Sequence, residues 1–390
     1  MLFKSSNSAQ KCKIIRGHVV PNYSTATLQD GHEESLWRFR GHCEVACPAL
    51  PGNAGDRGRY LWTDAFGVVN FVTLWHTTGE DRYLEAAKRL VQAVHDTLGR
   101  TRDGSSRLPG ASDAEPLKGG LRIGKVDEAG PDGDGQYHHY LTLWMFALSC
   151  LAVASEDYRY NDLAIQLAQA IHPRFIVSKS SGELSMVWKV STDMSRPLSR
   201  SKGHLDDVTG YVVFERLAST ACWFGQNSSD DQSPLAKEME QYWSMMERSR
   251  PLQSSADLLD LGMSLWVANF QSKEGGEMLR ELGAHGKSFA HVTFIDRIDG
   301  PYTLLQKSVG RRLAFRELGG CLGIKCYAKD DADLVASADA VVEFWENHAD
   351  EYTPDDLLAI TEVMLAAALL PGAFDRSYFD RRRRAEEGSS

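Results

Sequence analysis

The chain has 390 residues, of which 43% are hydrophobic and 25% charged, and this composition is typical of a globular protein. It excludes a disordered or collagen-like chain. The formal net charge is −10, and the one dense basic run, Arg381 to Arg384, is followed at once by acidic residues, so we expect a solvated tail there and no nucleic-acid surface.

The distribution of cysteine and apolar residues points to a compartment. Seven cysteines are an odd number with no CxxC spacing and no Cys/His cluster, so we expect no metal site. We also expect no cofactor. Cys150 and Cys222 lie in apolar helical runs and are expected to be core thiols. No window holds the roughly 18 apolar residues of a membrane span, and the N-terminal segment has no signal-peptide run. We expect a soluble cytoplasmic protein with no membrane contact.

The first predicted elements form a helical hairpin. Residues 65–77 (AFGVVNFVTLWHT) are apolar on nearly every side, which indicates a helix buried all round. After a turn at Gly79, residues 83–98 carry apolar residues at three- and four-residue steps. That spacing predicts an amphipathic helix with one face in water.

The same hairpin returns further along the chain. Residues 138–154 are again apolar almost throughout and are followed by an amphipathic run. Aligning Tyr83 with Tyr160 also pairs His95 with His172 in one register. We therefore interpret a buried helix followed by an amphipathic helix as a repeating unit.

Further helix pairs follow, giving five to six hairpins. The predicted partners are 206–224 with 234–248, 255–270 with 274–283, and 309–324 with 331–348, with 354–370 closing the series. Long Gly/Pro/Ser-rich connections occupy 99–136 and 173–204. Repeats that expose an apolar face must stack to bury it, and alternating buried and half-buried helices favour a closed double ring.

The segment LWHTTGEDRYLEAA (residues 74–87) carries a family resemblance. A small-residue turn, an acid, Arg-Tyr-Leu and then Ala-Ala resembles the hairpin linkers of the six-hairpin (α/α)6 toroids, which include glycosidases, unsaturated glucuronyl hydrolases and N-acylglucosamine 2-epimerases. The resemblance covers residues 60–370 and implies an all-α toroid with long loops at one mouth. We place an N-terminal extension at 1–55, the toroid at 56–372 and a charged tail at 373–390.

Acidic residues open most of the predicted inner helices. Asp64, Asp134 and the pair Asp206–Asp207 each precede an apolar run. Any one of them can cap a helix by accepting a backbone N–H. If the inner N-termini share one end of a ring, the carboxylates also converge there, and glycoside hydrolysis needs two carboxyl groups. We single out Asp64, Asp134 and Asp207, with Asp64 or Asp207 as the general acid and Asp134 as its partner.

Aromatic and cationic side chains near these acids predict a substrate surface. Trp62, Tyr137 and Trp188 offer flat faces of the kind that suit sugar rings, although most tryptophans of such a chain belong to the core. The loop SDAEPLKGGLRIGKV presents Arg122 and Lys125, which can bind an anionic group or can simply be solubilising charges.

The stretch GPDGDGQYHHYLTLW, residues 130–144, allows three interpretations. A metal loop fails, because the spacing is not that of an EF-hand and adjacent histidines point to different helix faces. A helix cap at Asp134, with the helix starting near Gln136, explains the acid but not two histidines. Histidines oriented by carboxylates can transfer protons near neutral pH, so we expect an active-site rim with His138, His139 and His204.

These observations predict a carbohydrate-active enzyme that hydrolyses a glycosidic or uronyl bond of a small sugar, which can be anionic. In that prediction His138 or His139 contacts the substrate and Arg122 binds its anionic group. Two alternatives stay open. Epimerases that resemble this fold use histidines as acid and base, and a non-catalytic toroid would use its acids as caps. The oligomeric state does not follow from the sequence.

Overall fold

The computed structural model describes residue 41 and residues 55–130, 133–226, 233–250, 255–270, 276–295 and 309–379. Most of the predicted N-terminal extension, with Cys12, Cys43 and Cys47, lies outside the described residues. The same holds for the tail from residue 380 onward, including the arginine run.

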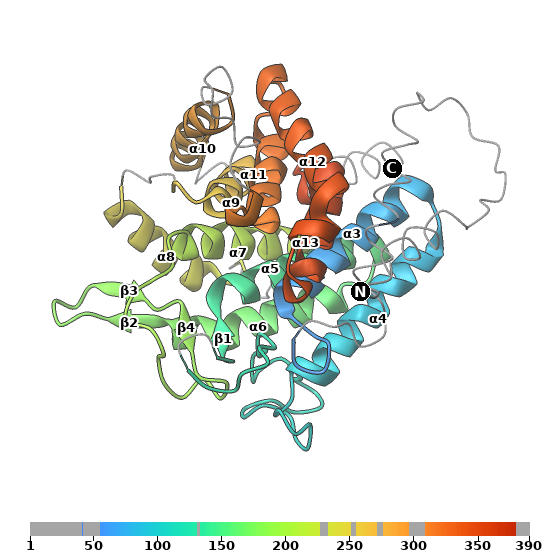
Figure 1. The fold of residues 1–390 in the computed structure, drawn as a ribbon. Coiled ribbons are helices and arrows are strands. Elements are labelled where there is room, and N and C mark those ends of the chain that lie inside the picture. Colours follow the sequence, from blue (N-terminus) through green and yellow to red (C-terminus); the bar gives the residue numbers. More distant parts are fainter. Residues whose placement is uncertain are drawn as a thin grey trace, which may run out of the picture.

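Six inner helices form a ring within the described residues. They are α3 (Leu61–Thr78), α5 (His138–Ser155), α7 (Asp206–Trp223), α9 (Leu258–Asn269), α11 (Ala314–Tyr327) and α13 (Asp355–Leu369). Each packs against the next, and α13 packs against α3. Figure 1 shows this closure, with the red α13 beside the blue α3 although the two helices come from opposite ends of the chain.

An outer helix follows each of the first five inner helices and packs on it. These outer helices are α4 (Asp81–Leu98), α6 (Arg159–Phe175), α8 (Ala236–Arg248), α10 (Gly276–Ala290) and α12 (Ala332–Tyr352). A π-helical turn, η1 (His291–Ile295), extends α10, and a 3-10 turn, η3 (Val309–Arg311), precedes α11. The predicted all-α toroid of repeated hairpins is therefore confirmed.

The sequence pattern explains which helix lies inside. Residues 61–74 of α3 are all buried, whereas α4 buries only one stripe. The turn between them is made by Gly79, whose φ of 71° is left-handed and whose N–H donates to the carbonyl of Trp75. The equivalent histidines of the first two repeats, His95 on α4 and His172 on α6, are both buried against the ring.

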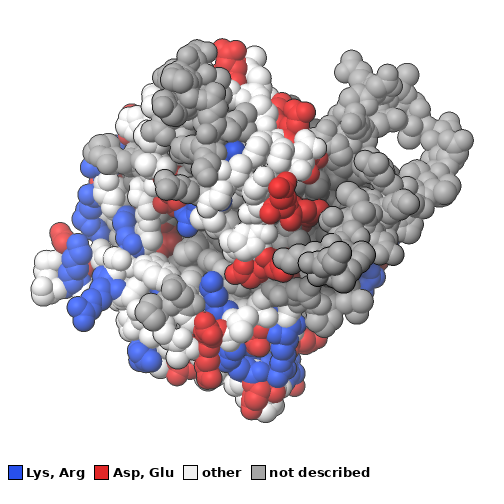
Figure 2. Space-filling view, in the orientation of Figure 1, with Lys and Arg blue, Asp and Glu red and all other residues white. Residues whose placement is uncertain are grey.

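The two long connections carry the short strands. In the first sheet β1 (Gln136–Tyr137) pairs with β4 (Lys189–Val190), and in the second β2 (Ile176–Ser178) pairs with β3 (Leu184–Met186), both antiparallel. The first pair ties the two connections together. Figure 1 places the β2–β3 hairpin at the left of the molecule, and Figure 2 shows Lys and Arg side chains gathered on that side.

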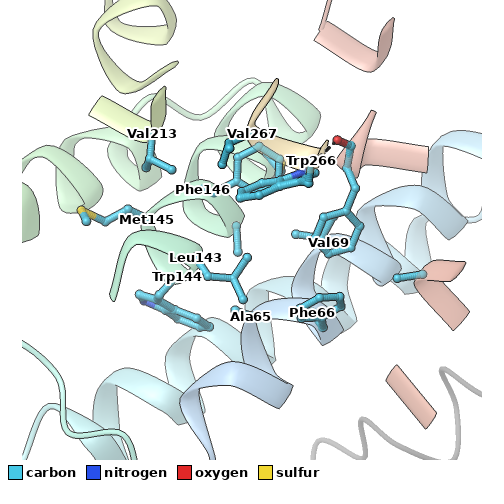
Figure 3. Close-up of a cluster of buried hydrophobic side chains, with 14 of the residues drawn as sticks. Ala65, Phe66, Val69, Leu143, Trp144, Met145, Phe146, Val213, Trp266 and Val267 are labelled. Carbon is cyan, nitrogen blue, oxygen red and sulfur yellow. Dashed lines mark hydrogen bonds between the residues drawn. The ribbon is translucent and has the colours of Figure 1, made fainter. Parts of the chain in front are cut away.

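Large aromatic side chains fill the centre of the ring, as Figure 3 shows for Phe66, Phe146 and Trp266. The ring of Phe374, in the 3-10 turn η4 (Gly372–Phe374), lies 4.8 Å from that of Phe66 and 6.0 Å from that of Phe146. The Nε1–H group of Trp266 donates to the Phe374 carbonyl at 3.1 Å. The segment after α13 therefore closes the end of the ring at which the inner helices finish.

Two expectations, a domain boundary and the burial of a cysteine, need correction. Phe374, Tyr378 and Phe379 are buried, so the packed body extends past the predicted boundary at residue 372. Cys150 is a buried thiol as expected, but Cys222 is exposed, because it lies on the outward side at the end of α7. Among the described residues, no helix combines the length and the apolar character needed to cross a membrane.

Candidate active site

A cavity of about 670 Å³ opens at the N-terminal ends of the inner helices. All six inner helices supply residues from their first two turns: Trp62, Thr63, His139, Tyr140, Asp206, Thr209, Asp260, Met263, Phe315, Arg316, Asp356 and Ile360. The two long connections add Lys125, Asp127 and His204. The inner helices therefore present their N-termini at one mouth, where their dipoles favour carboxylates.

His139 and Asp206 form the most enclosed polar pair of this cavity. His139 Nδ1 lies 3.6 Å from Asp206 Oδ1, and the Asp206 side chain is only 2% exposed whereas that of His139 is 39% exposed. A carboxylate behind one nitrogen of an imidazole fixes the orientation of the ring. The other nitrogen, Nε2, is thereby left for a molecule in the cavity.

Asp206 is held as a carboxylate. Its burial opposes ionisation, but His138 and His139, which both face it, outweigh that cost and hold the pKa of Asp206 well below its usual range. Its second oxygen, Oδ2, accepts the Gly203 N–H at 2.7 Å. Asp206 is therefore a fixed negative charge and cannot serve as a proton donor near neutral pH.

A second imidazole borders the cavity beside a second carboxylate. His204, in the connection before α7, has its Nδ1 3.8 Å from Asp260 Oδ2 on α9. Both side chains are partly exposed, at 38% and 44%. The cavity thus holds two accessible imidazoles, each with an acid at its Nδ1.

Aromatic rings form one wall. Trp62 packs edge-on against Tyr140, with ring centroids 5.3 Å apart, and lies 6.2 Å from the His139 ring. The hydroxyl groups of Tyr60 and Tyr140 are hydrogen-bonded to each other. Burial, with Tyr60 beside it, raises the pKa of Tyr140 far above its usual value, so this phenol stays protonated. Such a wall suits the apolar face of a sugar ring.

The cations of the cavity are Lys125 and Arg316. Lys125 lies over the Tyr60 ring, with Nζ 5.5 Å from the centroid. Arg316 Nη1 is paired with Asp257, whose carboxylate also caps α9 by accepting the N–H groups of Leu259 and Asp260. Of the predicted substrate contacts, the cavity therefore brings together Trp62, Lys125, His139 and His204.

Asp64 lies behind this wall and does not line the cavity. Its carboxylate pairs with Arg59 Nη1 at 3.1 Å and accepts the Tyr60 N–H at 3.1 Å. Burial raises the pKa of Asp64 to about 7, against the opposing effects of Arg59 and the Tyr60 N–H. The structure places this predicted general acid in a buried ion pair at the start of α3.

Asp134 and Arg122 also lie outside the cavity lining, in a buried cluster beneath the first connection. Asp134 Oδ2 accepts from Arg122 Nη1 at 2.6 Å and from Arg102 Nη1 at 2.9 Å. Arg122 Nη2 pairs with Asp56 at 2.9 Å, and its side chain is 1% exposed. This arginine is therefore engaged by protein carboxylates, and the pair holds the connection against the ring.

The predicted helix cap at Asp134 is wrong. Gln136 and Tyr137 are extended because they pair with Val190 and Lys189, so α5 begins only at His138. The carboxylate of Asp134 accepts instead from the two arginines and from the N–H groups of Gly124 and Gly135.

Four other predicted residues lie near the site without lining it. Asp207 points away and pairs with Lys202 Nζ at 2.5 Å. His138 is fully buried and faces the outer helix α8. Tyr137 and Trp188 pack edge-on against each other, with centroids 4.9 Å apart, in the loop layer. Among the described residues, no group of three or more His, Cys, Asp or Glu is placed to hold a metal ion.

Sequence reasoning missed Asp206, Asp260 and Arg316. Asp206 stands beside Asp207 in the same predicted helix start, and only the direction of each side chain separates them. Asp260 was not singled out because Asp257, three residues earlier, already explained an acid at the start of that helix as a cap. An acid in the first turn of an inner helix, on the side facing the ring axis, is the signal that would have found both acids.

No protein-family model matches the sequence, and no curated protein matches it. Solved structures do match. A family 76 α-mannanase from Bacteroides thetaiotaomicron is 10% identical with a TM-score of 0.57, over 91% of this chain and 98% of that one. A cellobiose 2-epimerase from Spirochaeta thermophila is 13% identical with a TM-score of 0.51, over 88% and 99%. A D-mannose isomerase is 11% identical with a TM-score of 0.52, over 90% and 100%.

Structural similarity at sequence identities this low shows the fold but not the reaction. The reaction has to be inferred from the site. In fold, this chain is an (α/α)6 toroid similar to these structures.

Proposed function

We propose that the chain is a carbohydrate-active enzyme that moves a proton on a small reducing sugar, as an epimerase or aldose–ketose isomerase. The observation that carries this proposal is the pair of accessible imidazoles, His139 and His204, each with a carboxylate at Nδ1, on one cavity. Histidine is the side chain best suited to accept and donate protons near neutral pH.

The chemistry needs one base and one acid. A base removes the proton from the carbon next to the carbonyl of the open-chain sugar, and an acid returns a proton to the same carbon or to its neighbour. Asp206 stabilises the imidazolium that forms when His139 accepts a proton, in the way a buried carboxylate supports a catalytic histidine. His204, beside Asp260, is the second group in this assignment.

The charge of the cavity supports an uncharged sugar over an anionic one. Four acids line it (Asp127, Asp206, Asp260 and Asp356) against Lys125 and Arg316, and Arg316 is already paired with Asp257. The net negative lining repels a carboxylate or phosphate. The wall of Trp62 and Tyr140 supplies apolar contact for the ring of a neutral sugar.

Hydrolysis, the reaction predicted from the sequence, stays a prediction, but its catalytic acids would have to be different residues. The acids Asp64, Asp134 and Asp207 do not line the cavity, so a hydrolase would have to use Asp260 and Asp356, which do. A binding-only toroid would use none of them. These alternatives differ in their products, and one experiment separates them.

The test is product analysis of purified protein with a panel of neutral reducing sugars and small glycosides. We expect interconversion of sugar epimers or of an aldose and a ketose, lost in His139→Gln and in His204→Gln. The control His285→Gln, on the exposed side of α10, keeps the activity. New reducing ends from a glycoside would show a hydrolase, and binding without turnover would show a non-catalytic protein.

A further inference from the structure

A line of polar groups runs from the outer ring of helices to the cavity. Tyr242, on the outer helix α8, has its hydroxyl 2.7 Å from His138 Nε2. His138 Nδ1 lies 3.5 Å from Asp206 Oδ1, the same oxygen that faces His139 Nδ1 at 3.6 Å. Tyr242, His138 and Asp206 are buried, and of the four residues His139 and Asp206 line the cavity.

The packing of α8 on α7 lets the Tyr242 side chain reach His138. A Cβ atom at Gly210 on α7 would lie 2.4 Å from the Tyr242 ring, so the absence of a side chain there lets α8 insert the ring. Gly210 is one turn after Asp206 on the same face of α7. The ring centroid of Tyr242 lies 4.7 Å from that of His172 and 5.2 Å from that of Phe214. These rings keep the Tyr242 hydroxyl away from water.

The Tyr242–His138 contact is a hydrogen bond, whereas both imidazoles face Asp206 in charge-pair contacts of 3.5 and 3.6 Å. An ionised carboxylate only accepts, so the nitrogens of both histidines that face Asp206 carry hydrogens. An imidazole with its one hydrogen on Nδ1 has a bare Nε2, and in His138 this nitrogen would accept the hydrogen of the Tyr242 hydroxyl. The same tautomer of His139 leaves Nε2 bare for a molecule in the cavity.

We propose that Tyr242 and His138 are positioning residues that fix Asp206, and through it the tautomer and orientation of His139. This inference rests on the proposed function, in which His139 is the proton-transferring group. Two imidazoles face the carboxylate oxygen Oδ1, so the His138 Nδ1 contact at 3.5 Å helps to fix the position of Asp206 when His139 takes up or gives back its proton. Neither Tyr242 nor His138 touches the substrate in this assignment.

The sharpest test compares His138→Asn with His138→Gln. An asparagine amide nitrogen takes the place of Nδ1 and keeps a donor to Asp206, whereas a glutamine amide takes the place of Nε2 and leaves Asp206 with one imidazole. We expect kcat of His138→Asn to stay within about tenfold of the wild type. We expect His138→Gln to lose about 10- to 100-fold in kcat with KM little changed, the range found for residues that orient histidine ligands of metals.

A second comparison keeps the ring packing intact. Tyr242→Phe removes only the hydroxyl, and Tyr211→Phe makes the same change at a buried tyrosine of α7 that does not line the cavity. In ¹⁵N NMR of the imidazoles, Tyr242→Phe should shift the Nε2 resonance that is absent in His138→Asn, and should lower kcat. Tyr211→Phe should change neither.

Equal kcat values for His138→Asn and His138→Gln, or imidazole resonances that ignore Tyr242→Phe, would overturn the proposal. The NMR comparison needs no substrate. If the wild type turns over no sugar, the proposed function fails. The resonances would still show whether Tyr242, His138, Asp206 and His139 are linked as described. Melting temperatures of all four variants identify any loss of kcat that comes from unfolding.

Discussion

At the scale of single residues, direction decides function. His138 and His139 are neighbours at the start of α5, yet one faces the outer helix α8 and the other the cavity, because successive helical residues point about 100° apart. Asp206 and Asp207 divide in the same way between the cavity and Lys202. The sequence located both pairs at a helix start, but it could not say which member faced inward, since that depends on where each helix begins.

The pKa of Asp64 predicts a stability change with pH. Its folded pKa is raised to about 7 by burial, so between about pH 4 and pH 7 the folded chain keeps a proton that the unfolded chain has released. The free energy of unfolding of the wild type, relative to Asp64→Asn, should therefore fall by a few kcal/mol as pH rises through this window and then level off. Urea unfolding of both proteins at four pH values measures this. A flat difference would contradict the raised pKa.

Asp134 is expected to contribute to folding stability and not to catalysis. Asp134→Ala leaves the buried guanidinium of Arg122 without its closest carboxylate, and breaking a buried pair in this way costs about 3 to 5 kcal/mol. The matched control is Asp113→Ala, whose side chain is 98% exposed and pairs with Arg107, and it should change stability by less than about 1 kcal/mol. Similar unfolding free energies for both variants would show that the cluster does not hold the connection.

At the scale of elements, the contact of α9 with α11 depends on glycine. A Cβ atom at Gly262 would lie 1.9 Å from the Gly319 carbonyl oxygen, and one at Gly323 would lie 2.2 Å from the Gly262 carbonyl oxygen. These two inner helices therefore touch backbone to backbone. The apolar pattern predicted that both helices are buried, but it did not predict this close approach.

A substitution at this contact has a clear expected outcome. Gly262→Ala must push α9 and α11 apart, and overpacking of this kind costs about 1 to 3 kcal/mol or more. Gly276→Ala, at the start of α10 where a Cβ meets nothing within 4 Å, is the control and should be neutral. Thermal unfolding of both variants measures the difference, and an unchanged melting temperature for Gly262→Ala would contradict the packing described for the ring.

The helices and loops also show which parts of the fold could be predicted from the sequence. The hairpin repeat predicted the inner and outer helices well, because a helix apolar all round has nowhere to lie except inside. It failed at Gln136 and Tyr137, where pairing with the distant strand Lys189–Val190 overrides the helical pattern. It failed again at Phe374 and Tyr378, whose burial depends on the open end of the ring, which no local pattern reveals.

At the scale of the whole molecule, ring closure creates the site. Acids and histidines that are far apart in the sequence meet because six inner helices begin at one mouth, while the aromatic cluster around Phe374 closes the opposite end. None of the three acids predicted at this mouth lines the cavity, since capping, ion pairing and catalysis use the same residue type. The cavity selects among them by geometry.

Proton transfer at the cavity is the central claim, and isotope exchange tests it most directly. The wild type is incubated with a neutral reducing sugar in deuterated water, and loss of the proton on the carbon next to the carbonyl is followed by NMR. We predict exchange in the wild type and in His285→Gln, and a rate lowered at least about 100-fold in His139→Gln. Exchange that is as fast in His139→Gln as in the wild type, or sugars that change without exchanging this proton, would contradict the account.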